Sequence, residues 1–332
     1  MKGQIYKIHS DFYYVQANGQ SFECKLREVL KKQKVTIVVG DYVLFDNGHI
    51  LSVLPKKTYI PRPSVANVDQ IVIVSALKDP DLDFLQLNRY ISLAKYYKIP
   101  AILCFTKEDL SDGTNLQDKI LSIYSKLDYK IIFTSIKNNK GLDNLLKILL
   151  GKTSALCGNS GVGKSSLINA LNPNVHLKTN VISEKTHRGT HTTRHCEIIA
   201  INNNSAIVDT PGFSNVKFDF MLPIDVSNLF DEINQYKQNC KYSDCLHINE
   251  SDCEVLKNID SIDETRYESY IELVNEALEY KEKVKYNGIK KETNLKFNNN
   301  KMAVKISQRK RQSSRNTLKQ NIYKEIKNND NE

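Results

Sequence analysis

The sequence lacks any uninterrupted apolar run close to the roughly 20 residues that a membrane-spanning helix requires. Its first residues, MKGQIYKIHSDF, also lack the apolar segment of a secretory signal peptide. We therefore expect a cytoplasmic protein without a membrane anchor. Cysteine is sparse, with 7 in 332 residues. Because a reducing compartment keeps thiols free, we expect these cysteines to bind metal or to pack as small hydrophobic residues, and we expect no disulfides.

Charge is distributed unevenly along the chain, whose formal net charge is +9. From residue 281 to the end there are 15 Lys or Arg against 5 Asp or Glu, an excess that accounts for the whole positive balance. A basic tail can gather the phosphates of a polyanion by releasing condensed counterions, or it can simply be a solvated segment. Because residues 286–332 also lose hydrophobic periodicity, we expect them to form a basic, mostly disordered tail.

Residues 1–58 are expected to form a small β-barrel. Five short apolar segments follow one another here, and two of the turns between them are Asn18-Gly19 and Asn47-Gly48. Oligonucleotide-binding (OB-fold) barrels have this size and strand number, although other small barrels with unrelated partners share them. A linker marked by prolines follows, with Pro55, Pro61 and Pro63.

Residues 64–222 are expected to form one α/β domain. Apolar strands alternate with amphipathic helices, which is typical of a doubly wound parallel sheet with helices on both faces. The helices between its strands are expected near residues 84–97, 115–127 and 142–149. The multidomain α/β class of the whole chain follows from this central sheet.

Residues 223–285 are expected to form a small helical module. It should contain a helix near residues 226–236, a cluster of cysteines and a long amphipathic helix. Ser261 and Glu264 have the spacing of a capping box, which predicts where the long helix begins.

A phosphate-binding loop is predicted between the strand SALC and the helix SSLINAL, where the eight residues GNSGVGKS match the glycine-rich pattern. Glycines let the backbone wrap phosphates with its N–H groups pointing inward. A lysine reaches the terminal phosphates, and the following serine hydroxyl binds Mg²⁺. The residues predicted to bind nucleotide here are Gly158, Asn159, Ser160, Gly161, Val162, Gly163, Lys164, Ser165 and Ser166.

A second phosphate-sensing motif follows at Asp209-Thr210-Pro211-Gly212, at the end of the strand SAIVD. There a carboxylate can hold Mg²⁺ through its water shell, and a glycine amide can sense the γ-phosphate. Between the two motifs lies the polar segment Gly189-Thr190-His191-Thr192-Thr193, which has the character of a mobile switch. We expect Thr193 to complete the Mg²⁺ shell together with Ser165 and Asp209, with Thr192 as the alternative.

Base recognition is predicted from two strand ends that come earlier in the chain, at residues 106–109 and 135–137. An aspartate can accept hydrogen bonds from guanine N1–H and N2–H, and a lysine stem can cover the ring. This chemistry favours guanine over adenine. The residues predicted to bind the base are Thr106, Lys107, Glu108, Asp109, Ser135, Ile136 and Lys137.

The order of these motifs resembles that of circularly permuted GTPases, and in particular the family of ribosome small-subunit-dependent GTPase A (RsgA). The amino-terminal barrel, the phrase PRPSVANVDQ and the carboxy-terminal Cys/His cluster strengthen the resemblance, which covers residues 1 to about 285. It implies GTP hydrolysis stimulated by the small ribosomal subunit, binding to its rRNA, and a role in late maturation of the subunit. The chain departs from the family pattern at Thr106, where Asn is usual, which puts one hydrogen bond to the guanine edge in question.

The residue that orients the attacking water is not the usual glutamine, because Phe213 follows Gly212. In the family that this chain resembles, a switch histidine has this role, and His191 matches its position. A neutral imidazole can orient water near pH 7. We therefore expect His191 and Lys164 to be catalytic, with His187 and His195 as competitors for the role of His191.

A metal site is predicted at Cys240, Cys245, His247 and Cys253, which place four soft or borderline ligands within a short polar segment. Four protein ligands leave no open position, so a structural Zn²⁺ is expected. The remaining cysteines lie on or beside predicted strands and are expected in the core: Cys24, Cys104, Cys157 and Cys196.

Two other functions compete with a subunit-stimulated GTPase. One is a nucleotide-gated RNA- or ribosome-binding module with vestigial hydrolysis, which Thr106 and the missing glutamine keep open. The other is an ATPase, which Asp109 and Ser135 disfavour. A monomer is expected because no surplus apolar helix or coiled-coil repeat is visible.

Overall fold

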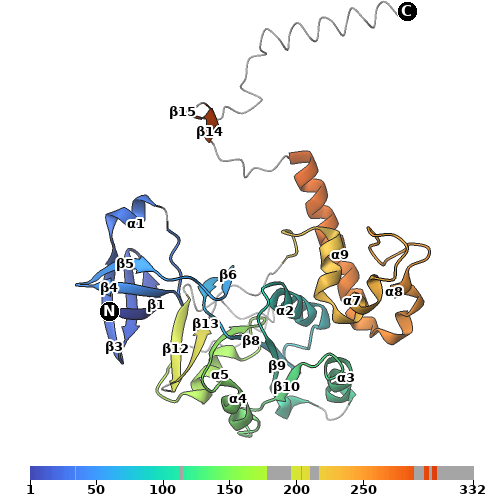
Figure 1. The fold of residues 1–332 in the computed structure, drawn as a ribbon. Coiled ribbons are helices and arrows are strands. Elements are labelled where there is room, and N and C mark those ends of the chain that lie inside the picture. Colours follow the sequence, from blue (N-terminus) through green and yellow to red (C-terminus); the bar gives the residue numbers. More distant parts are fainter. Residues whose placement is uncertain are drawn as a thin grey trace, which may run out of the picture. The chain divides into compact units, whose positions relative to one another are not determined.

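The computed structural model describes residues 1–33, 35–111, 115–177, 196–202, 204–209, 217–287, 295–298 and 301–304. The chain forms two compact units, residues 1–280 and 281–332 (Figure 1). In the second unit, β14 (Leu295–Asn298) and β15 (Lys301–Val304) form an antiparallel pair in a segment that we expected to be mostly disordered. Among the helices described, none has the length and apolar content needed to cross a membrane.

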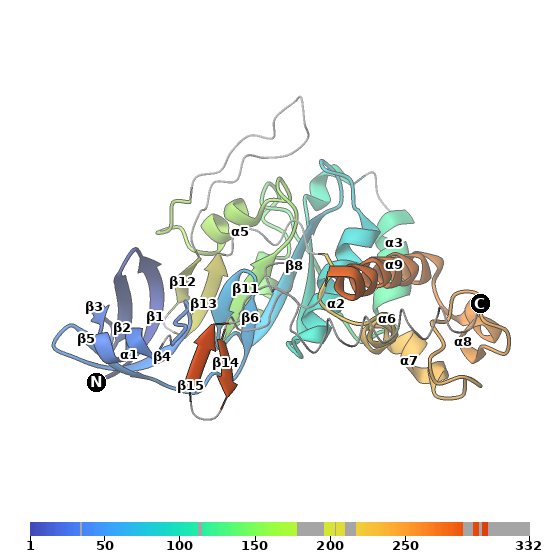
Figure 2. The ribbon, with the colours of Figure 1, turned by 90° about the horizontal axis from the view of Figure 1, so that it is seen from above.

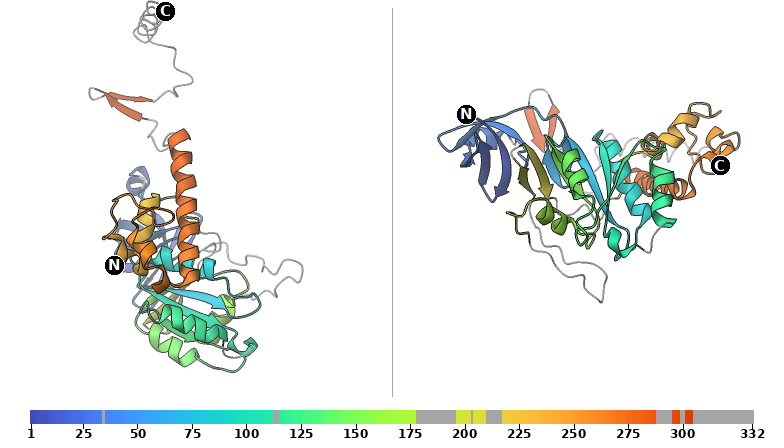
Figure 3. Two further views of the ribbon diagram at one scale, coloured as in Figure 1. Left: turned by 90° about the vertical axis from the view of Figure 1, so that its right-hand side faces the viewer. Right: turned by 90° about the horizontal axis from the view of Figure 1, so that it is seen from below.

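The amino-terminal strands form the predicted five-stranded barrel (Figure 3). They are β1 (Lys2–His9), β2 (Phe12–Ala17), β3 (Gln20–Leu26), β4 (Tyr42–Asp46) and β5 (His49–Val53). Their order is β1-β2-β3-β5-β4, and pairing of β1 with β4 closes the ring. Its core contains Ile5, Val15, Val43 and Ile50, all fully buried. A short helix that the sequence did not predict, α1 (Glu28–Lys32), connects β3 to the rest of the barrel.

The expected linker is partly ordered as a hairpin of β6 (Tyr59–Pro61) and β7 (Ser64–Ala66). Its prolines indicated only a linker. However, the inward-facing Ile60 and Val65 pair across the hairpin and are both fully buried in the core of the α/β domain. Burial of these two side chains explains why the segment folds.

The α/β domain is built on the order β10-β9-β8-β11-β13-β12, in which all pairs are parallel except β12 with β13. The strands are β8 (Gln70–Ala76), β9 (Ala101–Thr106), β10 (Lys130–Phe133), β11 (Thr153–Cys157), β12 (Glu197–Asn202) and β13 (Ser205–Asp209). Helices α2 (Phe84–Tyr96) and α3 (Asn115–Tyr124) share one hydrophobic cluster with the sheet, while α4 (Leu142–Leu149) and α5 (Lys164–Leu171) share another. The predicted doubly wound arrangement is therefore confirmed (Figure 2).

The barrel and the α/β sheet are joined edge to edge. Lys7 of β1 pairs with Glu197 of β12, and their side chains form an ion pair at 3.2 Å. The barrel is thereby connected to β12. This strand pairs with β13, and β13 ends at Asp209.

The carboxy-terminal module corrects two local predictions. The helix expected near residues 226–236 is broken into α6 (Pro223–Val226), a 3₁₀ turn and α7 (Asp231–Lys237), because Phe230 adopts an extended backbone and is fully buried. The capping box is also wrong. Ser261 ends a separate 3₁₀ turn, and it is Asp263 that accepts from the backbone N–H of Thr265, at 2.9 Å, at the start of α9 (Glu264–Asn287).

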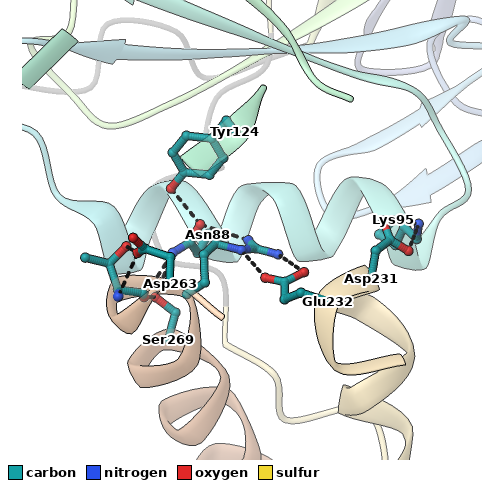
Figure 4. A network of polar contacts seen from close by, with 9 residues as sticks. Asn88, Lys95, Tyr124, Asp231, Glu232, Asp263 and Ser269 are labelled. Carbon is teal, nitrogen blue, oxygen red and sulfur yellow. Dashed lines mark hydrogen bonds and ion pairs between the residues drawn. The ribbon is translucent and has the colours of Figure 1, made fainter. Parts of the chain in front are cut away.

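A buried polar network attaches this module to α2 (Figure 4). Arg266 of α9 donates to Glu232 of α7 at 2.6 Å and to Asn88 of α2 at 2.9 Å. The amide of Asn88 donates to Ser269 of α9, and its oxygen accepts from Tyr124 of α3. Every polar atom named here therefore has a partner, as buried polar groups require.

Candidate nucleotide site and metal cluster

The glycine-rich loop connects the end of β11 to the start of α5, as predicted. Gly158 has φ 147°, and a Cβ atom at this position would overlap the backbone carbonyl oxygen of Val74 on β8. Gly161 and Gly163 have φ values of 81° and 93°. These backbone conformations and this close approach explain why glycines recur in the loop.

Lys164 places a positive charge inside the loop. Its ammonium donates to the carbonyl oxygens of Gly158 at 2.8 Å and of Asn159 at 2.7 Å. Burial lowers the pKa of Lys164, while the nearby charge of Asp209 opposes that shift. Ser165 and Ser166 follow in the first turn of α5. This arrangement can bind a chain of phosphates.

The phosphate loop is supported by a tyrosine that the sequence did not single out. Tyr90 of α2 is 2% exposed, and its hydroxyl donates to the side-chain oxygen of Asn159 at 2.9 Å. In the sequence, Tyr90 is one apolar position of an amphipathic helix, so nothing there distinguishes it from an ordinary core residue.

The two predicted base-binding segments lie together. The Ser135 hydroxyl donates to the Asp109 carboxylate at 2.6 Å, across a sequence separation of 26 residues. Lys107 adopts the left-handed conformation and contacts the carbonyl of Asp79, and burial lowers its pKa. The carboxylate of Glu108 accepts from Lys140 at 2.6 Å. Two other predicted residues, Ile136 and Lys137, are exposed.

Thr106 lies between the base-binding segment and the phosphate loop. It is 3% exposed, and its hydroxyl donates to the carbonyl oxygen of Val162 at 2.6 Å. The sequence suggested a position at the guanine edge, and the contact with the loop was not foreseen.

Asp209 ends β13 beside the phosphate loop. It is 5% exposed and lies in register with Leu156 of β11, the strand that leads into the loop. The rest of the predicted switch and catalytic residues lie outside the described residues: Thr190, His191, Thr192, Thr193 and Gly212, and also Phe213, His187 and His195.

The structure brings together the four predicted metal ligands. The donor atoms of Cys240, Cys245, His247 and Cys253 all lie within 4.8 Å of one another. The imidazole Nδ1 is 3.6 Å from the Cys240 sulfur and 3.5 Å from the Cys253 sulfur, and these two sulfurs are 3.9 Å apart. Metal bonds of about 2.3 Å to sulfur and about 2.0 Å to nitrogen give tetrahedron edges of roughly 3.8 Å and 3.5 Å. The cluster could therefore hold a metal ion.

Three further side chains fix the loop that carries the four predicted metal ligands. The sequence did not identify these three residues. Glu250 accepts from the backbone N–H groups of Leu246 and Ile248, at 2.6 and 2.9 Å. From α9, Tyr270 donates to the carbonyl of Leu246 and Tyr267 to that of His247, both at 2.8 Å. Both tyrosines lie in the predicted long amphipathic helix, where nothing in the sequence distinguishes them from ordinary apolar positions.

Three of the other cysteines are buried in the core, as expected: Cys24, Cys104 and Cys157. Burial raises the pKa of Cys104 to about 12, which keeps this thiol protonated at neutral pH. Cys196, just before β12, is only half-buried.

The sequence model of the RsgA GTPase family matches residues 53–219, and that of the RsgA N-terminal domain matches residues 2–49. The chain belongs to the RsgA GTPase family. It is thus a GTPase with an amino-terminal barrel and a circularly permuted P-loop domain, as the motif order predicted. A model described as a 50S ribosome-binding GTPase matches residues 153–294, starting at β11. A match that begins there is expected when a permuted chain is aligned with GTPases in which the phosphate loop comes first.

Relatives of the RsgA family resemble the chain over most of its length. The small ribosomal subunit biogenesis GTPase RsgA of Alkaliphilus metalliredigens is 38% identical over 284 residues, which are 83% of this chain and 97% of the relative. The protein of that name from Bacillus cereus is 39% identical over 84% of this chain and 98% of its own.

Two solved structures have the same fold. YjeQ from Thermotoga maritima superposes with a TM-score of 0.72 at 32% identity, over 83% of this chain and 98% of that one. YloQ, described as a circularly permuted GTPase, gives a TM-score of 0.68 at 28% identity, over 84% of this chain and 95% of that one.

Proposed function

We propose that this chain binds GTP in the site formed by the phosphate loop and the two base-binding segments. It hydrolyses GTP to GDP and phosphate when stimulated by the small ribosomal subunit, and it acts in late maturation of that subunit. The observation that carries the nucleotide assignment is the direct contact between the three motifs, through Thr106 with Val162 and Ser135 with Asp109. The ribosomal role is supported by the names of the RsgA relatives.

The contacts to phosphate, Mg²⁺ and base are each assigned to predicted residues in this proposal. Gly158–Ser166 bind the phosphates, and Lys164 neutralises their charge as it develops. Ser165, Thr193 and, through water, Asp209 would hold the Mg²⁺ that bridges the phosphate oxygens, and the Gly212 amide would sense the γ-phosphate. Asp109 accepts from guanine N1–H and N2–H, and Ser135 orients the Asp109 carboxylate.

Preference for guanine tests the nucleotide assignment. GDP is expected to bind at least about 100-fold more tightly than ADP, because adenine lacks the two donors that Asp109 accepts. Equilibrium titration of the purified protein with fluorescent GDP, competed with unlabelled GDP or ADP, measures this ratio. Equal affinity for the two nucleotides would contradict the assignment and favour an ATPase or an unselective site.

His191 is proposed to orient the attacking water. His191→Ala is expected to lower stimulated turnover by about 100-fold or more while leaving GTP affinity nearly unchanged, because the contact develops in the transition state. Turnover and GTP affinity are measured on the same preparation. His187→Ala and His195→Ala serve as matched variants, and a larger loss in either would transfer the role to that residue.

We propose that the metal is a structural Zn²⁺, because three thiolates and one imidazole suit this ion and three of the four donors lie at the spacing of tetrahedron edges. Purified protein is expected to contain about one zinc per chain, and Cys253→Ser is expected to lose it and to unfold at lower temperature. Elemental analysis and thermal unfolding measure the two quantities. A zinc content near zero in protein purified without chelators would contradict the site.

The parts of the chain outside the nucleotide site, which are the barrel, the zinc module and the basic tail, are assigned to ribosome contact. We propose that the barrel (1–58), the α/β domain (64–222), the zinc module (223–285) and the basic tail (286–332) are the functional divisions of a cytoplasmic monomer. The 15 basic residues from position 281 onward supply charge for rRNA phosphates.

A further inference from the structure

Thr106 contacts the phosphate loop through its hydroxyl group, which is the only hydrogen-bond donor of its side chain. Its hydroxyl proton is committed to the Val162 carbonyl at 2.6 Å, and the next carbonyl within reach, that of Ser75, is at 3.4 Å. A threonine side chain has no other donor. In this arrangement, Thr106 therefore has no proton left to give to guanine O6 or N7, which are both acceptors.

The contact fixes one peptide of the phosphate loop. Val162 is 3% exposed, and Gly163 follows it at φ 93°. In a planar trans peptide, the C=O of one residue and the N–H of the next point in opposite directions. When Thr106 holds the Val162 carbonyl toward β9, the N–H of Gly163 is turned away from that strand.

An N–H turned away from β9 can face the inner side of the loop, where phosphates bind. Lys164 follows Gly163 directly, and its ammonium binds the carbonyls of Gly158 and Asn159 across the loop. An inward N–H of Gly163 is one of the donors that a phosphate-binding loop requires. Asn159, at the other end of the loop, is held separately by Tyr90.

We propose that Thr106 is a positioning residue for phosphate binding and does not read the base. It couples the strand end that carries Asp109 to the phosphate loop by orienting the peptide between Val162 and Gly163. Guanine selectivity is then left to Asp109 and its partner Ser135. The proposal rests on the nucleotide site assigned above. Within that site it assigns phosphate-loop positioning to Thr106 and base recognition to Asp109.

The test combines three variants with three nucleotides. Thr106→Val keeps the shape of the side chain and removes the donor, Thr106→Ala removes the donor by truncation, and Thr106→Ser keeps the hydroxyl. Affinities are measured for GDP, for 7-deaza-GDP, which lacks N7, and for the diphosphate of 2-aminopurine riboside, which lacks O6 and the N1–H that Asp109 accepts. Each variant is therefore compared with the wild type on the same nucleotide, so that the lost Asp109 contact cancels. Thermal unfolding midpoints identify any variant that has lost its fold.

Thr106→Val and Thr106→Ala are expected to weaken the binding of all three nucleotides by the same factor, roughly tenfold, because the carbonyl of Val162 loses its hydrogen-bond donor. Thr106→Ser is expected to stay within about twofold of the wild type. A loss in Thr106→Val that disappears with either analogue would show a base contact and overturn the proposal, as would unchanged GDP affinity in both Thr106→Val and Thr106→Ala. Wild-type protein that binds GDP no better than ADP would instead overturn the nucleotide site itself.

Discussion

Replacing Asp109 by Asn is expected to weaken GDP binding by about 100- to 10,000-fold and to improve binding of xanthosine diphosphate. Two hydrogen bonds to a charged acceptor are worth about 3–6 kcal/mol. The asparagine NH₂ group would face the guanine N2–H donor, whereas xanthine has a carbonyl oxygen at that position. Competition titrations with GDP and xanthosine diphosphate measure the exchange of specificity.

Asp118→Asn is the matched control for this experiment. Asp118 lies on α3 and is exposed, so the variant makes the same change of charge away from the proposed base site. It is expected to leave both affinities unchanged. If Asp109→Asn also leaves the ratio of GDP to xanthosine diphosphate affinity unchanged, Asp109 does not read the base.

The buried pair of Arg266 and Glu232 gives the largest expected effect on stability. Glu232→Gln is expected to lower the free energy of unfolding by about 3–5 kcal/mol, because it leaves the guanidinium buried without its counter-charge. Arg266 is 1% exposed and Glu232 is 9% exposed. Urea unfolding followed by circular dichroism measures the loss.

The neighbouring residue provides the control (Figure 4). Asp231 forms an ion pair with Lys95 at 2.6 Å, the same separation as between Arg266 and Glu232. However, the side chains of Asp231 and Lys95 are both more than 40% exposed. Asp231→Asn is therefore expected to cost at most about 1 kcal/mol. If both variants lost the same free energy of unfolding, burial would not be what makes the ion pair of Arg266 and Glu232 strong.

Features carried by neighbouring residues could be predicted from the sequence. The glycine-rich loop and the Cys/His cluster are both short patterns in which residue type and spacing reflect one local geometry. Alternating apolar segments likewise predicted the barrel and the doubly wound sheet, because burial on one or both faces of a strand leaves a periodic pattern.

Contacts between distant residues could not be predicted in this way. Thr106 and Val162 are 56 positions apart, and Tyr90 and Asn159 are 69 apart. A threonine at a strand end and a tyrosine on a helix have many ordinary explanations, and only the tertiary fold selects one. Arg266 and Glu232 similarly look like charged residues of two amphipathic helices until the fold buries them together.

Two local predictions were wrong because tertiary contacts favour a different local structure. The break before α7 arises because Phe230 packs against Tyr270, with ring centroids 5.4 Å apart, and this packing overrides the helical pattern. The spacing of Ser261 and Glu264 imitates a capping box, but the Ser261 hydroxyl donates to the carbonyl oxygen of Asn258 at 2.7 Å and lies 3.1 Å from the Tyr236 hydroxyl, which leaves Asp263 to cap α9. In both cases tertiary contacts decide between alternatives that the local sequence allows.

The most direct test of the proposed function is GTP hydrolysis by the purified protein with and without purified small ribosomal subunits, with ATP as the control nucleotide. We predict slow hydrolysis by the protein alone and a large increase with small subunits that is specific for GTP. GTP binding without any stimulation by small subunits would contradict the proposal and would favour a nucleotide-gated RNA-binding module.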